Sequence, residues 1–204
     1  MKFLIGKKEA MTQIFSEDGK VHPVTVIEAG PIVVAQIKTK EKDGYSAIQF
    51  GFGAAKEKRM TKAEKGHLKE VGNLAVLKEF RVTQEEAGKM KNGDRLDVSI
   101  FSEGEKVTVS AISKGKGFQG GVKRHGFHGG PRTHGQKHSE REPGSIGGGL
   151  RTRVPKGMRM AGRMGGDRIT VKNLKVIAAN KEKNLLLVQG AVPGRRGTVV
   201  EIKG

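Results

Sequence analysis

The sequence predicts a mainly β protein: a closed β-barrel with a small helical insertion and a long glycine-rich basic extension. Short β-branched runs recur before residue 113 and after residue 168, and tight-turn dipeptides such as Asp18-Gly19 and Asn92-Gly93 separate them. The 56 residues from 113 to 168 show neither a helix nor a strand period. Aromatic residues are few and Trp is absent, so the core must be built from Val, Ile and Leu.

The expected strands in the first half are short. Apolar and polar residues alternate most cleanly in 96–101 and 106–112. The expected strands before residue 113 are 24–29, 32–37, 45–50, 96–101 and 106–112. Between them, residues 61–72 are rich in Lys, Glu and Ala. A capping-box motif, Thr61-Lys62-Ala63-Glu64, predicts that a short helix begins there. Residues 83–87 suggest a second helical turn.

Strand character resumes after the middle of the chain, in 168–171, 174–177 and 185–188. Neither set of strands completes a barrel alone, so we expect one barrel domain from 1–112 and 169–204, with the helical insertion at about 55–92. Residues 113–168 are then an excursion from the barrel. Out and back, it reaches at most about 80–90 Å at roughly 3.3 Å per residue.

This middle segment has an unusual composition. It holds 16 of the 31 glycines, 13 Lys or Arg and four of the six His, but only three acids. Such a segment cannot bury enough apolar surface to offset the entropy of ordering. Because long structureless loops in compact domains are usually functional or disordered, we expect this one to become ordered by lying on a polyanion.

The overall charge supports a polyanionic partner. The 204 residues carry a net charge of +18, which favours nucleic acid or an anionic membrane. No run of about 18 apolar residues and no long basic amphipathic helix is visible, so membrane binding is the weaker alternative. The apolar run near the start is too short for a signal peptide, and cysteine is absent. We therefore expect a cytoplasmic protein.

One segment matches the sequence motifs of both the dinucleotide-binding fingerprint and the kinase glycine loop: Gly115-Lys116-Gly117-Phe118-Gln119-Gly120-Gly121-Val122. The fingerprint needs a helix directly after the glycines, and residues 123–126 show no helical pattern. The kinase loop needs downstream acids, which are nearly absent. Both interpretations are weak, since a lone glycine motif is expected by chance in a glycine-rich tract.

Four histidines, at 125, 128, 134 and 138, allow a metal site as an alternative. The surrounding Lys and Arg would repel a cation, so contact with phosphates or bases is favoured, and a solvated flexible loop is the remaining alternative. The acids Glu140, Glu142 and Asp167 each lie beside Arg and do not cluster. We therefore expect no enzyme, no catalytic residue, no metal and no cofactor.

The candidate nucleic-acid contacts are the cations of the extension with its His and Phe side chains. Glycine lets the backbone approach phosphates closely, and three Met residues are expected to pack locally. The candidates are Lys114, Lys116, Phe118, Lys123, Arg124, His125, His128, Arg132, His134, Lys137, Arg141, Arg151, Arg153, Lys156, Arg159 and Arg163.

Ordered motifs along the whole chain resemble the ribosomal protein L3 family. They are Gly6-Lys7-Lys8-Glu9-Ala10-Met11-Thr12-Gln13-Ile14-Phe15, Ser113-Lys114-Gly115-Lys116-Gly117-Phe118, Gly121-Val122-Lys123-Arg124, Thr133-His134-Gly135, Pro143-Gly144-Ser145-Ile146-Gly147, Met160-Ala161-Gly162-Arg163-Met164-Gly165 and Asn184-Leu185-Leu186-Leu187-Val188-Gln189-Gly190-Ala191-Val192-Pro193-Gly194. The chain length and the lack of long insertions resemble the bacterial members.

This resemblance implies a barrel of the translation-factor type on the ribosome surface and an extension that reaches toward the peptidyl transferase centre. It also implies early binding near the 3′ end of the large-subunit rRNA, a role in nucleating assembly, and neighbouring ribosomal proteins as partners, with no membrane. Some bacterial relatives carry a methylated glutamine just after the Gly-Ser-Ile-Gly motif. Here Gly148-Gly149-Leu150-Arg151-Thr152 stands there, so the modification is not expected.

Overall fold

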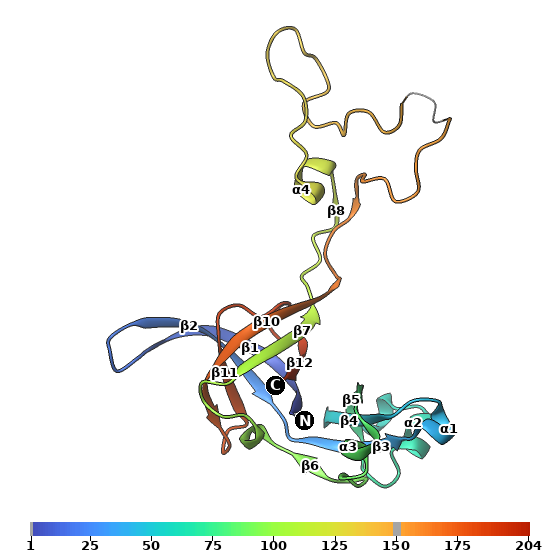
Figure 1. Ribbon diagram of the computed structural model, residues 1–204, viewed down its shortest axis with the longest axis vertical. Coiled ribbons are helices and arrows are strands. Elements are labelled where there is room, and N and C mark those ends of the chain that lie inside the picture. Colours follow the sequence, from blue (N-terminus) through green and yellow to red (C-terminus); the bar gives the residue numbers. More distant parts are fainter. Residues whose placement is uncertain (1, 149–151) are drawn as a thin grey trace. The chain divides into compact units, whose positions relative to one another are not determined.

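In the computed structural model, which describes residues 2–148 and 152–204, six strands close into an antiparallel barrel in the order β1-β12-β7-β10-β11-β2 (Figure 1). Three strands precede the extension and three follow it, so a closed barrel built from both parts of the chain is confirmed. The barrel strands are β1 (Phe3–Phe15), β2 (Val21–Ala29), β7 (Lys106–Ile112), β10 (Arg168–Asn180), β11 (Leu185–Gln189) and β12 (Val199–Lys203).

β1 and β12 pair with each other and close the barrel, but the sequence pattern predicted neither strand. The first strand holds Gly6, and most of its residues after that glycine are not buried, which obscures a strand pattern. Gly6 lies where β1 pairs with β2 on one side and β12 on the other. A Cβ there would lie 2.7 Å from the Glu28 carbonyl oxygen, so the closure of the barrel requires glycine.

Four further strands of the described chain form a second sheet in the order β5-β4-β3-β6. They are β3 (Ile32–Lys38), β4 (Ala47–Ala54), β5 (Leu74–Arg81) and β6 (Arg95–Leu96). The prediction that all the early strands join the barrel was therefore wrong, and β5 was not recognised. The reason is that β3 pairs with β4 and β6, while the barrel is already complete on both edges of β2.

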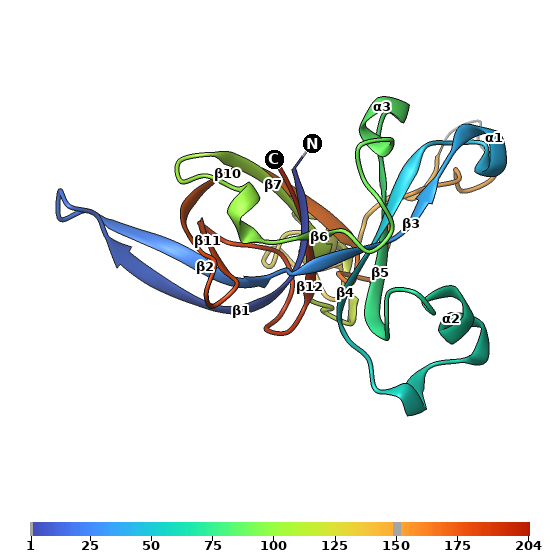
Figure 2. The ribbon, with the colours of Figure 1, turned by 90° about the horizontal axis from the view of Figure 1, so that it is seen from below.

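Short helices connect these strands: α1 (Lys40–Asp43), η1 (Glu57–Arg59), α2 (Lys62–His67), α3 (Gln84–Ala87) and η2 (Val98–Ile100). Figure 2 shows α2 and α3 beside the second sheet. Both helical predictions are confirmed, because capping boxes at Thr61 and Thr83 start α2 and α3. A strand over 96–101 was wrong: the Asp97 side chain accepts a hydrogen bond from the Ser99 amide at 3.0 Å and starts η2.

The barrel and the second sheet share one apolar core. The Phe3 ring of β1 stacks on Phe80 of β5 with centroids 4.1 Å apart, and lies 5.5 Å from the ring of Phe50 in β4. The rest of the core is mostly Val, Ile and Leu, as expected from the composition. Phe3 therefore ties the two sheets into one unit.

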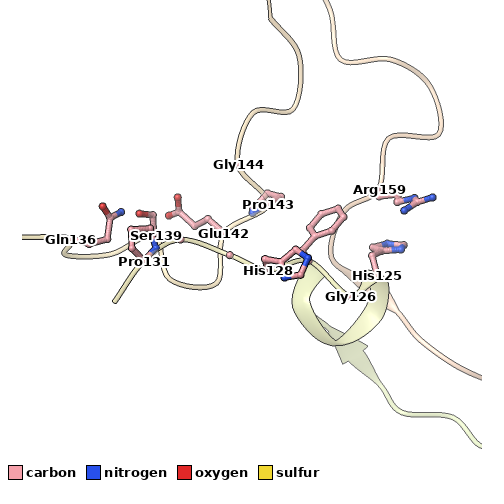
Figure 3. A pocket seen from close by; sticks show the side chains of 13 residues that line it. His125, Gly126, His128, Pro131, Gln136, Ser139, Glu142, Pro143, Gly144 and Arg159 are labelled. Atoms are coloured by element: carbon pink, nitrogen blue, oxygen red, sulfur yellow. The ribbon is translucent and has the colours of Figure 1, made fainter. Parts of the chain in front are cut away.

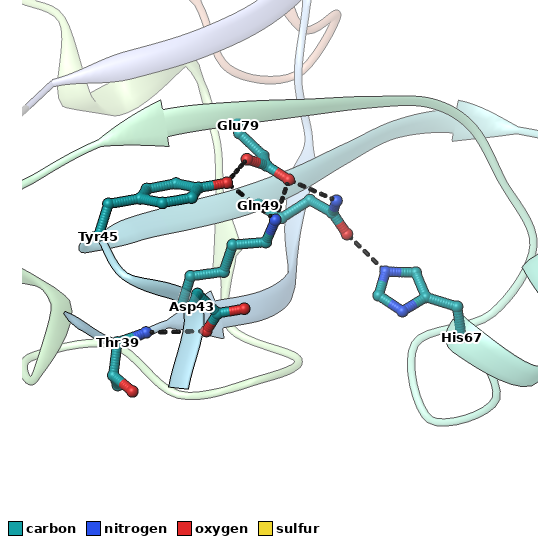
Figure 4. A network of polar contacts seen from close by, with 7 residues as sticks. Thr39, Asp43, Tyr45, Gln49, His67 and Glu79 are labelled. Carbon is teal, nitrogen blue, oxygen red and sulfur yellow. Dashed lines mark hydrogen bonds and ion pairs between the residues drawn. The ribbon is translucent and has the colours of Figure 1, made fainter. Parts of the chain in front are cut away.

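A polar network covers part of the second sheet (Figure 4). The Glu79 carboxylate lies 2.6 Å from Lys38 Nζ and accepts hydrogen bonds from Tyr45 Oη at 2.7 Å and Gln49 Nε2 at 3.3 Å. The His67 ring nitrogen Nε2 lies 2.6 Å from Gln49 Oε1, which links α2 to the sheet. The hydrogen bond with Lys38 lowers the pKa of Glu79, and the same bond raises the pKa of Lys38.

The Phe3→Ala variant of the full chain tests the shared core. We expect it to lower the free energy of unfolding by about 3–5 kcal/mol, because Phe3 is 2% exposed and the cavity would lie between two sheets. Urea denaturation measures the change. The control is Phe118→Ala, since Phe118 is 77% exposed and its loss should cost less than about 0.5 kcal/mol. Equal effects of the two variants would contradict a shared core.

The network around Glu79 predicts a dependence of stability on pH. The pKa of Glu79 is lowered in the folded state from 4.5, so its contribution is present above that pH and is lost as the pH falls through the folded value. Glu79→Gln should cost up to about 1 kcal/mol at neutral pH, with a smaller difference from wild type in strong acid. Urea titrations at several pH values measure this. Glu70→Gln serves as control because Glu70 is exposed. If Glu79→Gln lowers the free energy of unfolding by the same amount at every pH, the lowered pKa of Glu79 does not contribute to stability.

Candidate nucleic-acid interface

The residues between the two barrel strands β7 and β10 form a second compact unit, Ser113–Asp167, which we call the extension. Its outgoing arm (113–120) and returning arm (160–167) run antiparallel. The Lys116 amide donates to the Met164 carbonyl at 2.9 Å, and β8 (Phe118–Gln119) pairs with β9 (Gly162–Arg163). A Cβ on Gly165 would lie 2.2 Å from the Lys114 carbonyl oxygen. Because Gly165 has no Cβ, the two arms can approach each other this closely.

A five-residue helix, α4 (Gly121–His125), follows the outgoing arm and ends at Gly126 with φ 72°. The prediction that residues 123–126 are not helical was therefore wrong, because a single turn is too short to show a helical period. The Phe127 ring packs on the helix start, where a Cβ on Gly121 would lie 2.8 Å from its Cδ2 atom. The strands on either side of α4 in the chain, β8 and β9, pair antiparallel, so α4 is not the crossover helix of a βαβ unit, which needs parallel strands.

Two candidate contacts are engaged inside the extension. The Arg124 guanidinium donates to the Met160 carbonyl oxygen at 2.7 Å, and the His125 Nε2 atom lies 3.0 Å from the same oxygen. A Cβ on Gly162 would lie 2.8 Å from the Arg124 Nη1 atom, so glycine leaves room for the guanidinium. Arg124 and His125 therefore connect α4 to the returning arm, and both are only partly exposed.

The other described candidates are exposed. Arg132 lies 3.3 Å from the Glu140 carboxylate, yet its side chain stays 85% exposed. His134 has φ 59° and lies in a turn with Gly135. Arg151 lies outside the described residues. The exposed candidates are Lys114, Lys116, Phe118, Lys123, His128, Arg132, His134, Lys137, Arg141, Arg153, Lys156, Arg159 and Arg163. The structure thus leaves most of the predicted contacts accessible.

The extension also contains a cavity of about 550 Å³ that sequence reasoning did not find (Figure 3). Its lining includes His125, Phe127 and His128 near α4, and Gln136 and Glu142 from the segment that follows. No sequence motif marks these residues as a group, because the fold of the extension brings the two segments together.

Two further properties concern the parts of the chain that the structure covers. No three His, Cys, Asp or Glu side chains in 2–148 and 152–204 form a group suited to a metal ion. Within the same residues, no helix is long and apolar enough to cross a membrane.

A closed barrel with a long, exposed cationic segment is typical of proteins that bind a polyanion. The comparisons with known proteins identify the family. The model of the family described as ribosomal protein L3 matches residues 4–185. The chain is 52% identical over 201 residues to a large ribosomal subunit protein uL3 of Herpetosiphon aurantiacus, covering 98% of this chain and 94% of the relative.

It is 50% identical to proteins of the same name from Dehalococcoides mccartyi, over 98% of this chain and 96% of the relative, and Carboxydothermus hydrogenoformans, over 99% and 96%. The chain belongs to the ribosomal protein L3 family. The resemblance inferred from the motifs is therefore confirmed. This is a structural family of the ribosome, which agrees with the expectation that the protein is not an enzyme.

Adjacent cations in α4 allow a test of the internal role of Arg124. Arg124→Ala removes the hydrogen bond to Met160, and we expect the Lys116 and Met164 amides to exchange about fivefold faster, which corresponds to about 1 kcal/mol. Hydrogen–deuterium exchange of the free full-length protein measures this. Lys123→Ala, which removes an exposed neighbouring charge, should leave both amides unchanged. Equal exchange in the two variants would show that Arg124 does not hold the arms.

Proposed function

We propose that the protein is a structural component of the large ribosomal subunit in the cytoplasm. The barrel domain, residues 1–112 and 169–204, binds the large-subunit rRNA near its 3′ end and helps nucleate assembly. Residues 113–168 penetrate the rRNA and reach toward the peptidyl transferase centre, with neighbouring ribosomal proteins as further partners. Family membership supports this proposal, as does the name shared by the relatives, large ribosomal subunit protein uL3.

One observation carries the RNA-binding part of the proposal. Every described Lys and Arg of the extension except Arg124 is exposed, although the segment contains only three acids. Like charges kept this close together and accessible are stabilised when phosphates neutralise them. Arg side chains can hold a phosphate with two hydrogen bonds, and the exposed His side chains add further donors.

The framework of the extension favours binding. Both ends are fixed by the barrel, since Ile112 of β7 pairs with Arg168 of β10. The paired arms and α4 restrict the backbone further. A partly ordered segment loses less conformational entropy on binding than a free chain of equal charge, so more of the phosphate attraction contributes to affinity.

Salt dependence of rRNA binding tests the proposal. If about seven or eight cations contact phosphates, the log–log slope of the association constant against salt should be about −5 to −7, at roughly 0.7–0.9 per phosphate. The probe is a fragment from the 3′ region of large-subunit rRNA, measured with the full-length protein. Lys156→Ala should reduce the magnitude of the slope by about 0.7–0.9.

The competing function is binding to another polyanion, such as heparin or an anionic membrane. Under our proposal, the protein sediments with the large subunit through a high-salt wash, and heparin or anionic vesicles bind more weakly than the rRNA fragment. A slope near −1, or equal affinity for all three polyanions, would contradict the proposal.

A further inference from the structure

We infer that the cavity of the extension receives the base of one unstacked rRNA nucleotide, and that this base is guanine. The inference rests on the proposed function and adds a specific ligand to it. Its volume, about 550 Å³, falls within the usual range of small-ligand pockets, roughly 300–1,000 Å³. Sequence-specific proteins often hold unstacked RNA bases against aromatic rings and read their edges with hydrogen bonds.

One wall of the cavity is aromatic. It includes the rings of His125 and Phe127, whose centroids lie 5.7 Å apart with 34° between the planes, and His128 follows them in the chain. This wall has fixed supports. His125 contacts the Met160 carbonyl oxygen, and the Phe127 amide donates to the Gly121 carbonyl at 3.4 Å. Flat rings held in this way offer a stacking surface for a base.

The opposite wall is polar and comes from the chain that returns past residue 130. The Gly130 amide donates to the Glu140 carbonyl at 3.2 Å, and the Glu142 amide donates to the Ser139 carbonyl at 3.4 Å. A Cβ on Gly129 would lie 1.9 Å from the Glu140 carbonyl oxygen, so the two segments touch backbone to backbone. Figure 3 shows Gln136, Ser139 and Glu142 on this side and His128 and Arg159 on the other.

The charge of Glu142 decides which part of a nucleotide faces this wall. No ion pair involves Glu142 among the described residues, whereas Glu140, two positions earlier, pairs with Arg132. A carboxylate repels phosphate and accepts N–H donors. The base edge therefore faces Glu142, and Arg159 is the cation of the lining that is suited to the phosphate.

Base chemistry favours guanine at this position. Its Watson–Crick edge carries two adjacent donors, the N1–H and the N2 amino group, which match the two oxygens of a carboxylate. Adenine and cytosine each offer one amino group beside a ring acceptor, and uracil offers one N–H between two carbonyl oxygens. Gln136 supplies both a donor and an acceptor nearby, which suits the remaining edge of guanine.

The matched pair Glu142→Gln and Glu140→Gln tests this inference, because both changes remove one negative charge from the same loop. Simple electrostatics predicts that both variants bind the rRNA more tightly. We instead expect Glu142→Gln to weaken binding about tenfold and Glu140→Gln to leave binding unchanged or tighter. The measurement is the affinity of each full-length variant for large-subunit rRNA.

Chemical probing of the same complexes identifies the base. A reagent specific for guanine N1 and N2, such as kethoxal, should show a guanine protected by the wild-type protein and by Glu140→Gln. That guanine should become reactive in Glu142→Gln and in Phe127→Leu, which keeps an apolar side chain beside Gly121 but removes the ring. Loss of protection in both variants would support stacking and edge contact together.

The outcomes separate this inference from the proposed function. If the salt slope of the wild-type protein is steep but Glu142→Gln behaves like Glu140→Gln, the base pocket is wrong while rRNA binding stands. Protection of an adenine from dimethyl sulfate in place of a guanine also overturns the inference. A wild-type protein that does not bind the rRNA refutes the proposed function itself.

Discussion

The pairing of β7 with β10 is the constraint on which the extension depends. Ile112 lies opposite Arg168, so a loop of more than fifty residues begins and ends at neighbouring positions of one sheet. Closing such a loop costs entropy that a glycine-rich segment cannot recover by burying a core of its own. The barrel offsets this cost, because β7 and β10 also pair with β12 and β11, and the Glu201 carboxylate binds the Arg168 guanidinium.

Within the extension, order comes from backbone contacts in place of an apolar core. Gly165 and Gly129 let carbonyl groups of the opposite segment approach closer than any Cβ allows. Arg124 contributes a charged donor to a backbone carbonyl, which is stronger than a neutral hydrogen bond. The glycines and cations therefore have two uses. Some hold the segment together, and the rest remain exposed to a ligand.

Local signals in the sequence predicted part of this structure, and long-range packing determined the rest. The capping box at Thr61 involves only four neighbouring residues, so the sequence alone predicted it, whereas residues 83–87 were predicted as a helical turn without the capping box that the structure shows at Thr83. The alternation in 96–101 was misleading because Asp97 starts a short helix there. The barrel strand β12 and the strand β5 were not recognised although Pro193-Gly194 and Gly72-Asn73 precede them, and the separation of two sheets follows from pairing that no local pattern encodes. The candidate cations were visible by composition, whereas Gln136 and Glu142 gain their significance only because they line the same cavity as the aromatic rings.

A cationic segment faces a physical conflict between affinity and order. Exposed like charges attract phosphates but repel one another, so each added Lys or Arg strengthens binding and loosens the free segment. An acid inside the segment relieves repulsion at a cost to affinity. Glu140 follows this logic, since it lies beside Arg132. Glu142 has no such pair among the described residues and lines a cavity with aromatic rings. A carboxylate placed there weakens the attraction for phosphate without relieving a close charge pair. In the inferred complex its benefit comes from the bound RNA, because the edge of guanine offers two adjacent N–H donors to one carboxylate, whereas a ribose offers a single 2′-hydroxyl.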